Sequence, residues 1–251
     1  MKNRDKHIIG ALEKFKVLER DQIADMFFSN LKHSVTNCNY ALRRLRDRGY
    51  IDCDTSKTPY QYFSKPSTIK KGSQKIEHYL KIAQTFIDMV KFGEVEMFEI
   101  EPYWKNVDVI PDVIAFWNKS YFAIEVQNSF YSVKQMKDKL DKYQKLYTSG
   151  GYKELPWQPK NNKYFPHVLI IGKTNSKYNF DEYSFRVFQY ESVSKFIEIE
   201  IPQTNKTETT KLEPQKKSIY EVAAAKQSTQ PIVNNATPKL NIQVPTSWKR
   251  K

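Results

Sequence analysis

Residues 110–129, IPDVIAFWNKSYFAIEVQNS, decide the fold of the middle of this chain. Two apolar stretches are separated by NKS at residues 118–120, which predicts the tight turn of a β-hairpin. Because side chains alternate between the two faces of a strand, Glu125 and Gln127 would share one face. If the two strands pair, Asp112 would converge with Glu125 near the open end of the hairpin.

The segments on either side of this hairpin predict an α/β core. Apolar spacing indicates a long helix before it and a second helix after it, and HVLIIG has the composition of a buried strand. The resulting order of helix, three strands, helix and strand predicts helices packed on a mixed sheet. The predicted bounds are Ser73–Phe92, Glu94–Glu101, Val107–Trp117, Ser120–Asn128, Val133–Tyr147 and His167–Gly172.

The paired carboxylates are the pattern with the clearest chemical meaning. Carboxylate oxygens are hard ligands, so Asp112 and Glu125 together could hold Mg²⁺. A bound Mg²⁺ would polarise a phosphate and lower the pKa of an attacking water. The sequence therefore predicts a metal site at these two residues.

Residues 1–70 indicate helices followed by a hairpin. Apolar residues at helical spacing predict a first helix: Ile8, Ile9, Leu12, Phe15 and Leu18. A third helix begins at Ser34 and ends near Gly49, a residue type that favours a helix stop. Its apolar stripe would consist of Val35, Cys38, Ala41, Leu42 and Leu45. Two strands follow, near Ile51–Asp54 and Gln61–Ser64. This arrangement resembles a winged helix-turn-helix.

The resemblance makes the third helix a DNA-recognition helix whose polar face enters the major groove. Arginine can reach guanine edges or phosphates, and asparagine can pair with adenine. Lys57, in the hairpin, could contact a phosphate. The alternative is a basic solvated face on a protein-interaction module. The expected DNA contacts on the helix are Thr36, Asn37, Asn39, Tyr40, Arg43, Arg44, Arg46 and Arg48.

The formal net charge of +13 is concentrated in the two ends of the chain. Residues 1–75 carry +8, residues 76–202 carry −1, and residues 203–251 carry +6. We therefore expect a DNA-binding part at residues 1–70, a differently specialised part at residues 73–202, and a disordered basic tail at residues 203–251. The two cysteines and the lack of a long apolar stretch predict a reduced, cytoplasmic protein without a membrane span.

Residues 73–202 resemble the PD-(D/E)XK nuclease superfamily, which shares the predicted element order. The resemblance assigns the metal to Asp112 and Glu125, and Glu77 on the first helix is placed to assist. The superfamily's lysine position falls on Gln127, which can form hydrogen bonds but carries no charge. Some members carry glutamine there, and others move the lysine to the following helix, where this chain has Lys134, Lys137 and Lys139. Loss of catalysis with retention of the fold is the other outcome.

The combination resembles the replication-relaxation family of bacterial plasmids, phages and conjugative elements over about residues 5–172. Its parts are the winged helix, the Glu77-His78 pair, the hairpin and the helix sequence KQMKDKLDKYQKLY. The resemblance implies double-stranded DNA as a ligand and replication or mobilisation proteins as partners. It establishes no activity for this chain.

Two functions from different classes follow. In the first, the protein acts in replication or DNA relaxation and carries a Mg²⁺-dependent endonuclease site, with Asp112, Glu125, Gln127, Glu77 and Lys139 as the catalytic set. In the second, it is a winged-helix transcriptional regulator whose inactive nuclease-like part serves homodimerisation or partner binding. Both predict DNA binding, and they differ in metal dependence.

Overall fold

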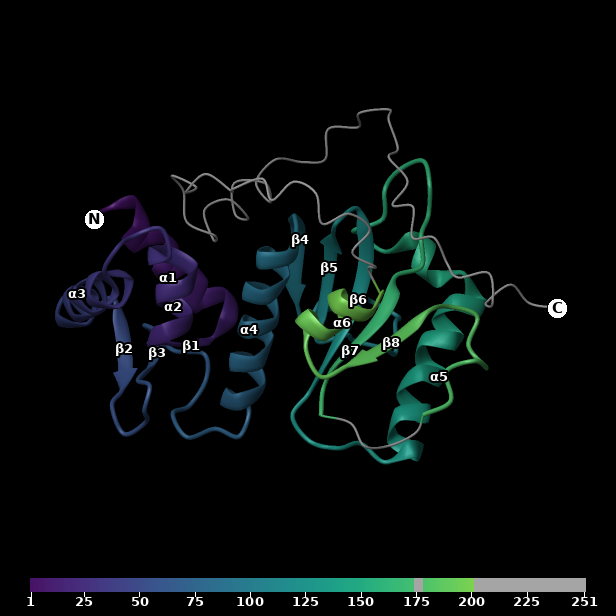
Figure 1. The fold of residues 1–251 in the computed structure, drawn as a ribbon. Coiled ribbons are helices and arrows are strands. Elements are labelled where there is room, and N and C mark those ends of the chain that lie inside the picture. Colours follow the sequence, from purple (N-terminus) through teal and green to yellow (C-terminus); the bar gives the residue numbers. More distant parts are fainter. Residues whose placement is uncertain (174–177, 201–251) are drawn as a thin grey trace.

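The computed structural model describes residues 1–173 and 178–200 and has a mixed α+β fold, as predicted. The described residues form one three-stranded and one five-stranded sheet, with helices packed against both (Figure 1). The tail predicted at residues 203–251 lies outside the described residues. Within the described part, no helix is long and apolar enough to cross a membrane.

The N-terminal part contains three helices around a small antiparallel sheet of order β1-β3-β2. The predicted bounds of β2 and β3 are confirmed. Leu18 was assigned to the first helix, but it lies in β1, because the helix ends at Phe15. The elements are α1 (Asn3–Phe15), β1 (Val17–Glu19), α2 (Arg20–Phe28), α3 (Ser34–Asp47), β2 (Ile51–Asp54) and β3 (Gln61–Ser64).

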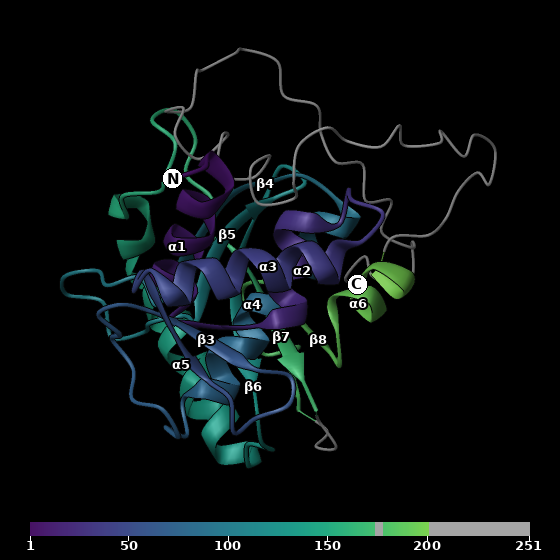
Figure 2. The same ribbon diagram turned by 90° about the vertical axis from the view of Figure 1, so that its left-hand side faces the viewer.

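Helix α3 packs through one apolar face and ends at Asp47, two residues before Gly49, which has a φ of 75°. The amide of Tyr50 donates to the carbonyl of Leu45 at 3.0 Å, which closes the last turn. The buried residues are Cys38, Ala41, Leu42 and Leu45, whereas Val35 is exposed, contrary to prediction. Figure 2, in which the left-hand side of Figure 1 faces the viewer, shows α3 running across the near side of the molecule.

The five-stranded sheet has the order β4-β5-β6-β7-β8. Strands β4, β5 and β6 are antiparallel, and β7 and β8 continue the sheet in parallel with β6. The predicted element order is confirmed, with β8 and α6 added after it. The elements are α4 (Ile76–Phe92), β4 (Val95–Ile100), β5 (Val113–Trp117), β6 (Ser120–Gln127), α5 (Val133–Ser149), a short 3-10 helix (Gly151–Glu154), β7 (His167–Gly172), β8 (Val187–Tyr190) and α6 (Val193–Glu200).

The predicted hairpin is formed by β5 and β6, and Val113 pairs with Ile124. Asn118 and Lys119 occupy the turn with φ values of 47° and 64°, which match the twist of a two-residue hairpin. The side chain of Asn118 accepts a hydrogen bond from the amide of Glu94 at 3.0 Å, which ties the turn to the start of β4. This register places the start of β5 beside the end of β6.

The two faces of this sheet are covered by different helices (Figure 1). Phe122, Ile124 and Val126 of β6 belong to the apolar core that contains α4 and α6. Ala123 belongs to a second core with Met136 and Leu140 of α5. Glu125 and Gln127 follow Ala123 at alternate positions, so they face α5.

Helix α4 packs against both sheets, so one apolar core runs from the N-terminal part into the second part. Phe86 of α4 packs on Phe15 of α1 and Phe98 of β4, with ring centroids 5.4 and 5.0 Å apart. The side-chain amide of Gln22 donates to the carbonyl of Leu80 at 2.8 Å. The division into residues 1–70 and 73–202 stays a prediction, and the packing joins the two parts through α4.

Candidate functional site

The candidate site is a pocket between the open end of the β5–β6 hairpin and α5. Asp112 immediately precedes β5, Glu125 and Gln127 lie near the end of β6, and Lys139 and Tyr143 lie one turn apart on α5. Four of the five predicted catalytic residues are therefore brought together from three separate segments. The remaining lining residues are Val126, Tyr131, Met136, Leu140 and Ile170.

Glu125 is the most deeply placed carboxylate of the pocket, with 4% of its surface exposed. Lys139 forms an ion pair with its Oε2, and the hydroxyl of Tyr143 donates to its Oε1 at 2.6 Å. Burial raises the pKa of Glu125 to about 7, and the charge of Lys139 offsets only part of this shift. Burial alone would lower the pKa of Lys139. The negative charges of Glu125 and Asp112 together have the larger effect and raise the pKa of that lysine.

Asp112 is held by a backbone amide and by a histidine. The amide of Val126 donates to its Oδ2 at 2.7 Å, and Nε2 of His78 lies 3.3 Å from its Oδ1. Burial would raise the pKa of Asp112, but the hydrogen bond with His78 and the charge of Lys139 outweigh it and lower that pKa. The same hydrogen bond raises the pKa of His78. Asp112 is therefore an anion that is stabilised by His78 and by the charge of Lys139.

Gln127 occupies the position where the resemblance expects a lysine. It is 2% exposed, and neither atom of its side-chain amide has a hydrogen-bond partner. Leaving a buried polar group unpaired costs about 1–3 kcal/mol, so such a group needs an explanation. Because Gln127 lines the pocket, a water or a ligand in the pocket would be the partner for its amide.

Three side chains of the pocket carry oxygen atoms of the kind that bind a metal ion. Asp112, Glu125 and the amide oxygen of Gln127 are hard oxygen donors on one pocket, which suits Mg²⁺. Among the described residues, however, no three His, Cys, Asp or Glu side chains form a metal-binding group. Each carboxylate oxygen already accepts from His78, Val126, Lys139 or Tyr143. Asp112, Glu125 and Gln127 would fit a metal ion once Lys139 moves away from Glu125.

The structure does not bring Glu77 to this pocket. Glu77 is exposed and lies near Glu19, whose pKa it helps to raise after the larger effect of burial. The next residue, His78, faces Asp112 instead. Successive residues of a helix point in directions about 100° apart. An error of one residue in the predicted orientation of α4 therefore exchanges Glu77 and His78.

Tyr143 contacts Glu125 but was given no role by the sequence interpretation. Its hydroxyl and the ammonium of Lys139, a predicted catalytic residue, both contact Glu125. Their spacing of four residues on one helix face was the available signal. Of the other candidate lysines on α5, Lys137 pairs with Asp141 and Glu182, outside the pocket.

The second candidate surface is the outer face of α3 (Figure 2). All but one of the DNA contacts predicted on this helix are exposed: Thr36, Asn37, Asn39, Tyr40, Arg43, Arg46 and Arg48. Arg44 is the exception, because its guanidinium lies 2.6 Å from the carboxylate of Asp5, which is 3% exposed. Arg44 therefore ties α3 to α1, and its contact with DNA stays a prediction.

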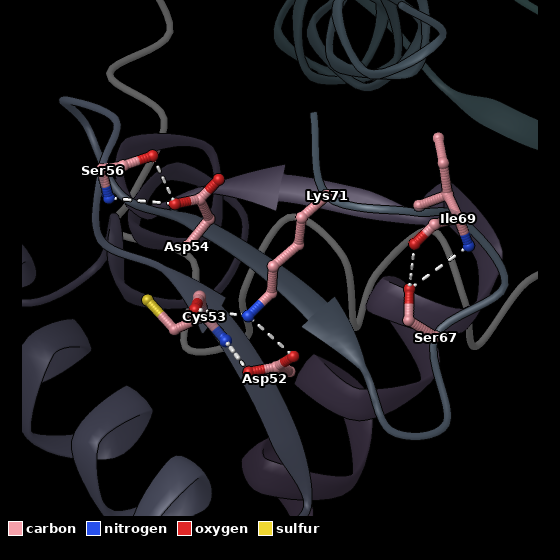
Figure 3. Close-up of polar contacts among 7 residues, drawn as sticks. All are labelled: Asp52, Cys53, Asp54, Ser56, Ser67, Ile69 and Lys71. Atoms are coloured by element: carbon pink, nitrogen blue, oxygen red, sulfur yellow. Dashed lines mark hydrogen bonds and ion pairs between the residues drawn. The ribbon is translucent and has the colours of Figure 1, made fainter. Parts of the chain in front are cut away.

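The β2–β3 hairpin lies next to α3 and presents Lys57 in its exposed turn. Lys71 fixes the outer edge of this hairpin (Figure 3). Its ammonium donates to the carbonyl of Cys53 at 2.9 Å and pairs with Asp52 at 2.9 Å. In the turn, the amide and hydroxyl of Ser56 both donate to Asp54. The hairpin is therefore held in a defined position beside α3.

No family model, curated protein or solved structure matches the chain. Its function must be inferred from the geometry of the pocket and of the α3 face.

Proposed function

We propose that this protein binds double-stranded DNA through a winged helix-turn-helix at residues 1–70. We propose further that residues 73–202 form a PD-(D/E)XK-like endonuclease part, and that the protein acts in plasmid or phage replication or in DNA relaxation. The observation that carries the proposal is the convergence of Asp112, Glu125, Gln127 and Lys139 on one pocket. Three separate segments within residues 112–139 contribute these side chains.

The charge distribution supports DNA as the ligand. Arg43, Arg46 and Arg48 are exposed on or next to α3, and the first 75 residues carry a net charge of +8. An exposed helix with basic and amide side chains is the arrangement that reads base edges in the major groove. The near-neutral second part would meet the DNA locally, at the pocket.

The pocket supplies the groups that hydrolysis of a phosphodiester requires. A Mg²⁺ ion bound there would polarise the scissile phosphate and activate a water. Asp112 and Glu125 would hold the ion, with the amide oxygen of Gln127 beside them. Lys139 supplies the positive charge that Gln127 lacks, and it would turn from Glu125 toward the phosphate. His78 and Tyr143 orient the two carboxylates.

The test is the nicking of supercoiled plasmid in the presence of Mg²⁺ or Mn²⁺. We expect the wild-type protein to produce open circles and Asp112→Asn to lose roughly 100-fold or more in rate, as when a group that acts in the transition state is removed. Asp108→Asn is the matched control, because Asp108 is an exposed residue of the same loop that pairs with Lys145. A folded wild-type protein without nicking activity, or equal rates for both variants, would contradict the endonuclease proposal.

A second function is favoured by the burial of Glu125 and its pairing with Lys139 and Tyr143. A carboxylate that is already neutralised by its own chain can be purely structural. The protein would then be a winged-helix transcriptional regulator whose inactive second part serves homodimerisation or partner binding. DNA binding that is indifferent to divalent metal, without nicking, would favour this function.

A further inference from the structure

Residues 65–75, KPSTIKKGSQK, connect β3 to α4 and form the most basic segment that neither candidate site uses. They contain four lysines and no acidic residue. Lys65, Lys70 and Lys75 are exposed, and within the described part of the chain none of them forms an ion pair. Three unneutralised ammonium groups therefore point to an anionic partner.

This segment has a fixed conformation (Figure 3). Lys71 bonds to Cys53 and Asp52 of β2, and the hydroxyl of Ser67 bonds to both the amide and the carbonyl of Ile69. Ile69 also packs against the apolar core. The lysines are thus carried on a backbone that is anchored to the hairpin, which reduces the entropy lost when they bind a ligand.

The segment lies between the two candidate sites. At one end it is bonded to β2 of the hairpin, and at the other it leads into the first turns of α4, where His78 contacts Asp112. In Figure 1 the hairpin turn, this segment and the starts of α4 and α5 lie along the same lower edge of the molecule. Lys81, one turn further along α4, donates to the carbonyl of Gln127 at 3.4 Å. Lysine side chains are therefore present both on residues 65–75 and next to the pocket.

We propose that residues 65–75 are a third DNA contact, which binds the phosphate backbone of a duplex between the α3–hairpin surface and the pocket. This inference rests on the proposed function, because it takes DNA as the ligand of both sites. Lysines act as point charges toward phosphate and do not read sequence, so the contact would position the duplex rather than select it. A duplex bound by α3 would thereby be directed toward Asp112 and Glu125.

The test uses the full-length protein and a labelled duplex of mixed sequence, with the dissociation constant measured over a range of salt concentrations. The variant carries Lys65→Ala, Lys70→Ala and Lys75→Ala, and it keeps Lys71 because that residue holds β2. The control carries Lys153→Ala, Lys160→Ala and Lys163→Ala, which remove the same charge from the exposed chain after α5. Circular dichroism verifies that both variants are folded.

Each phosphate contact contributes about 0.9 to the slope of log affinity against log salt. We expect the slope of the segment variant to fall by about two to three and its affinity by about 10-fold or more at low salt, with a smaller change in the control. Equal slopes and affinities for the two variants would overturn the third contact and leave the proposed function standing. A wild-type protein that does not bind the duplex would overturn both.

Discussion

At the scale of single residues, most of the pocket residues were predicted from the sequence. The contacts of His78 with Asp112 and of Tyr143 with Glu125 were not predicted. Asp112, Glu125 and Gln127 could be placed because strand alternation and one hairpin turn determine their faces. The exchange of Glu77 for His78 could not be foreseen, because α4 is apolar around most of its circumference. Its buried residues include Tyr79, Ile82, Phe86 and Met89 as well as Ile76, Leu80, Ala83 and Ile87, so periodicity does not fix its rotation.

The pairing of Arg44 with Asp5 was not predicted from the sequence, and it leads to a prediction about stability. Arg44→Ala leaves the buried carboxylate of Asp5 without its cation, since its remaining contact is the amide of Lys2 at 3.4 Å. We expect the free energy of unfolding to fall by about 3 kcal/mol. Urea unfolding measures this change.

Arg43→Ala is the control for that measurement. Arg43 is exposed and lies 3.7 Å from Asp47, so its loss should change stability by less than about 0.5 kcal/mol. If Arg44→Ala were as stable as Arg43→Ala, the ion pair would not tie α3 to α1, and Arg44 would be free to contact DNA.

At the scale of elements, strands bounded by turn residues were predicted best. The bounds of β2, β3 and β7 match the structure, because Pro59, Pro66 and Gly172 interrupt or end the apolar runs. Strand β1 was missed since it is three residues long and Leu18 continues the helical spacing of α1. Strand β8 is half-buried throughout and gives no alternating pattern. Such elements are specified by tertiary contacts rather than by local sequence.

The element that should decide DNA affinity is α3. We expect Arg43→Ala combined with Arg48→Ala to weaken duplex binding by about 10-fold and to lower the salt slope by about one per lost phosphate contact. The double variant avoids Arg44, whose removal would also loosen α3. Fluorescence anisotropy of a labelled duplex over a salt series provides the measurement.

Lys142→Ala combined with Lys153→Ala is the charge-matched control, because both residues are exposed and lie far from α3 in the sequence. An α3 variant that binds like this control would show that α3 is not the recognition helix. The basic face would then be a solvated surface of a protein-interaction module.

At the scale of the whole molecule, the charge pattern and the packing relate the two sites. The excess positive charge was predicted to mark a DNA-binding end and a tail, and within the described residues much of it lies on α3 and on residues 65–75. What the sequence could not reveal is that α4 belongs to both parts. Phe86 packs on α1 and β4, while His78 of the same helix contacts Asp112. A single helix thus links the N-terminal part to the pocket.

We propose that the pocket of Asp112, Glu125 and Gln127 holds a divalent metal. The most direct test is an isothermal titration of the duplex-bound protein with Mn²⁺, comparing the wild type with Glu125→Gln and with Glu154→Gln, an exposed control. We predict that the wild type and the control bind the ion and that Glu125→Gln loses at least about 10-fold in affinity, because a neutral amide replaces a charged hard ligand. No Mn²⁺ binding by the wild type, or equal binding by Glu125→Gln, would contradict the metal site and leave the pocket a structural network.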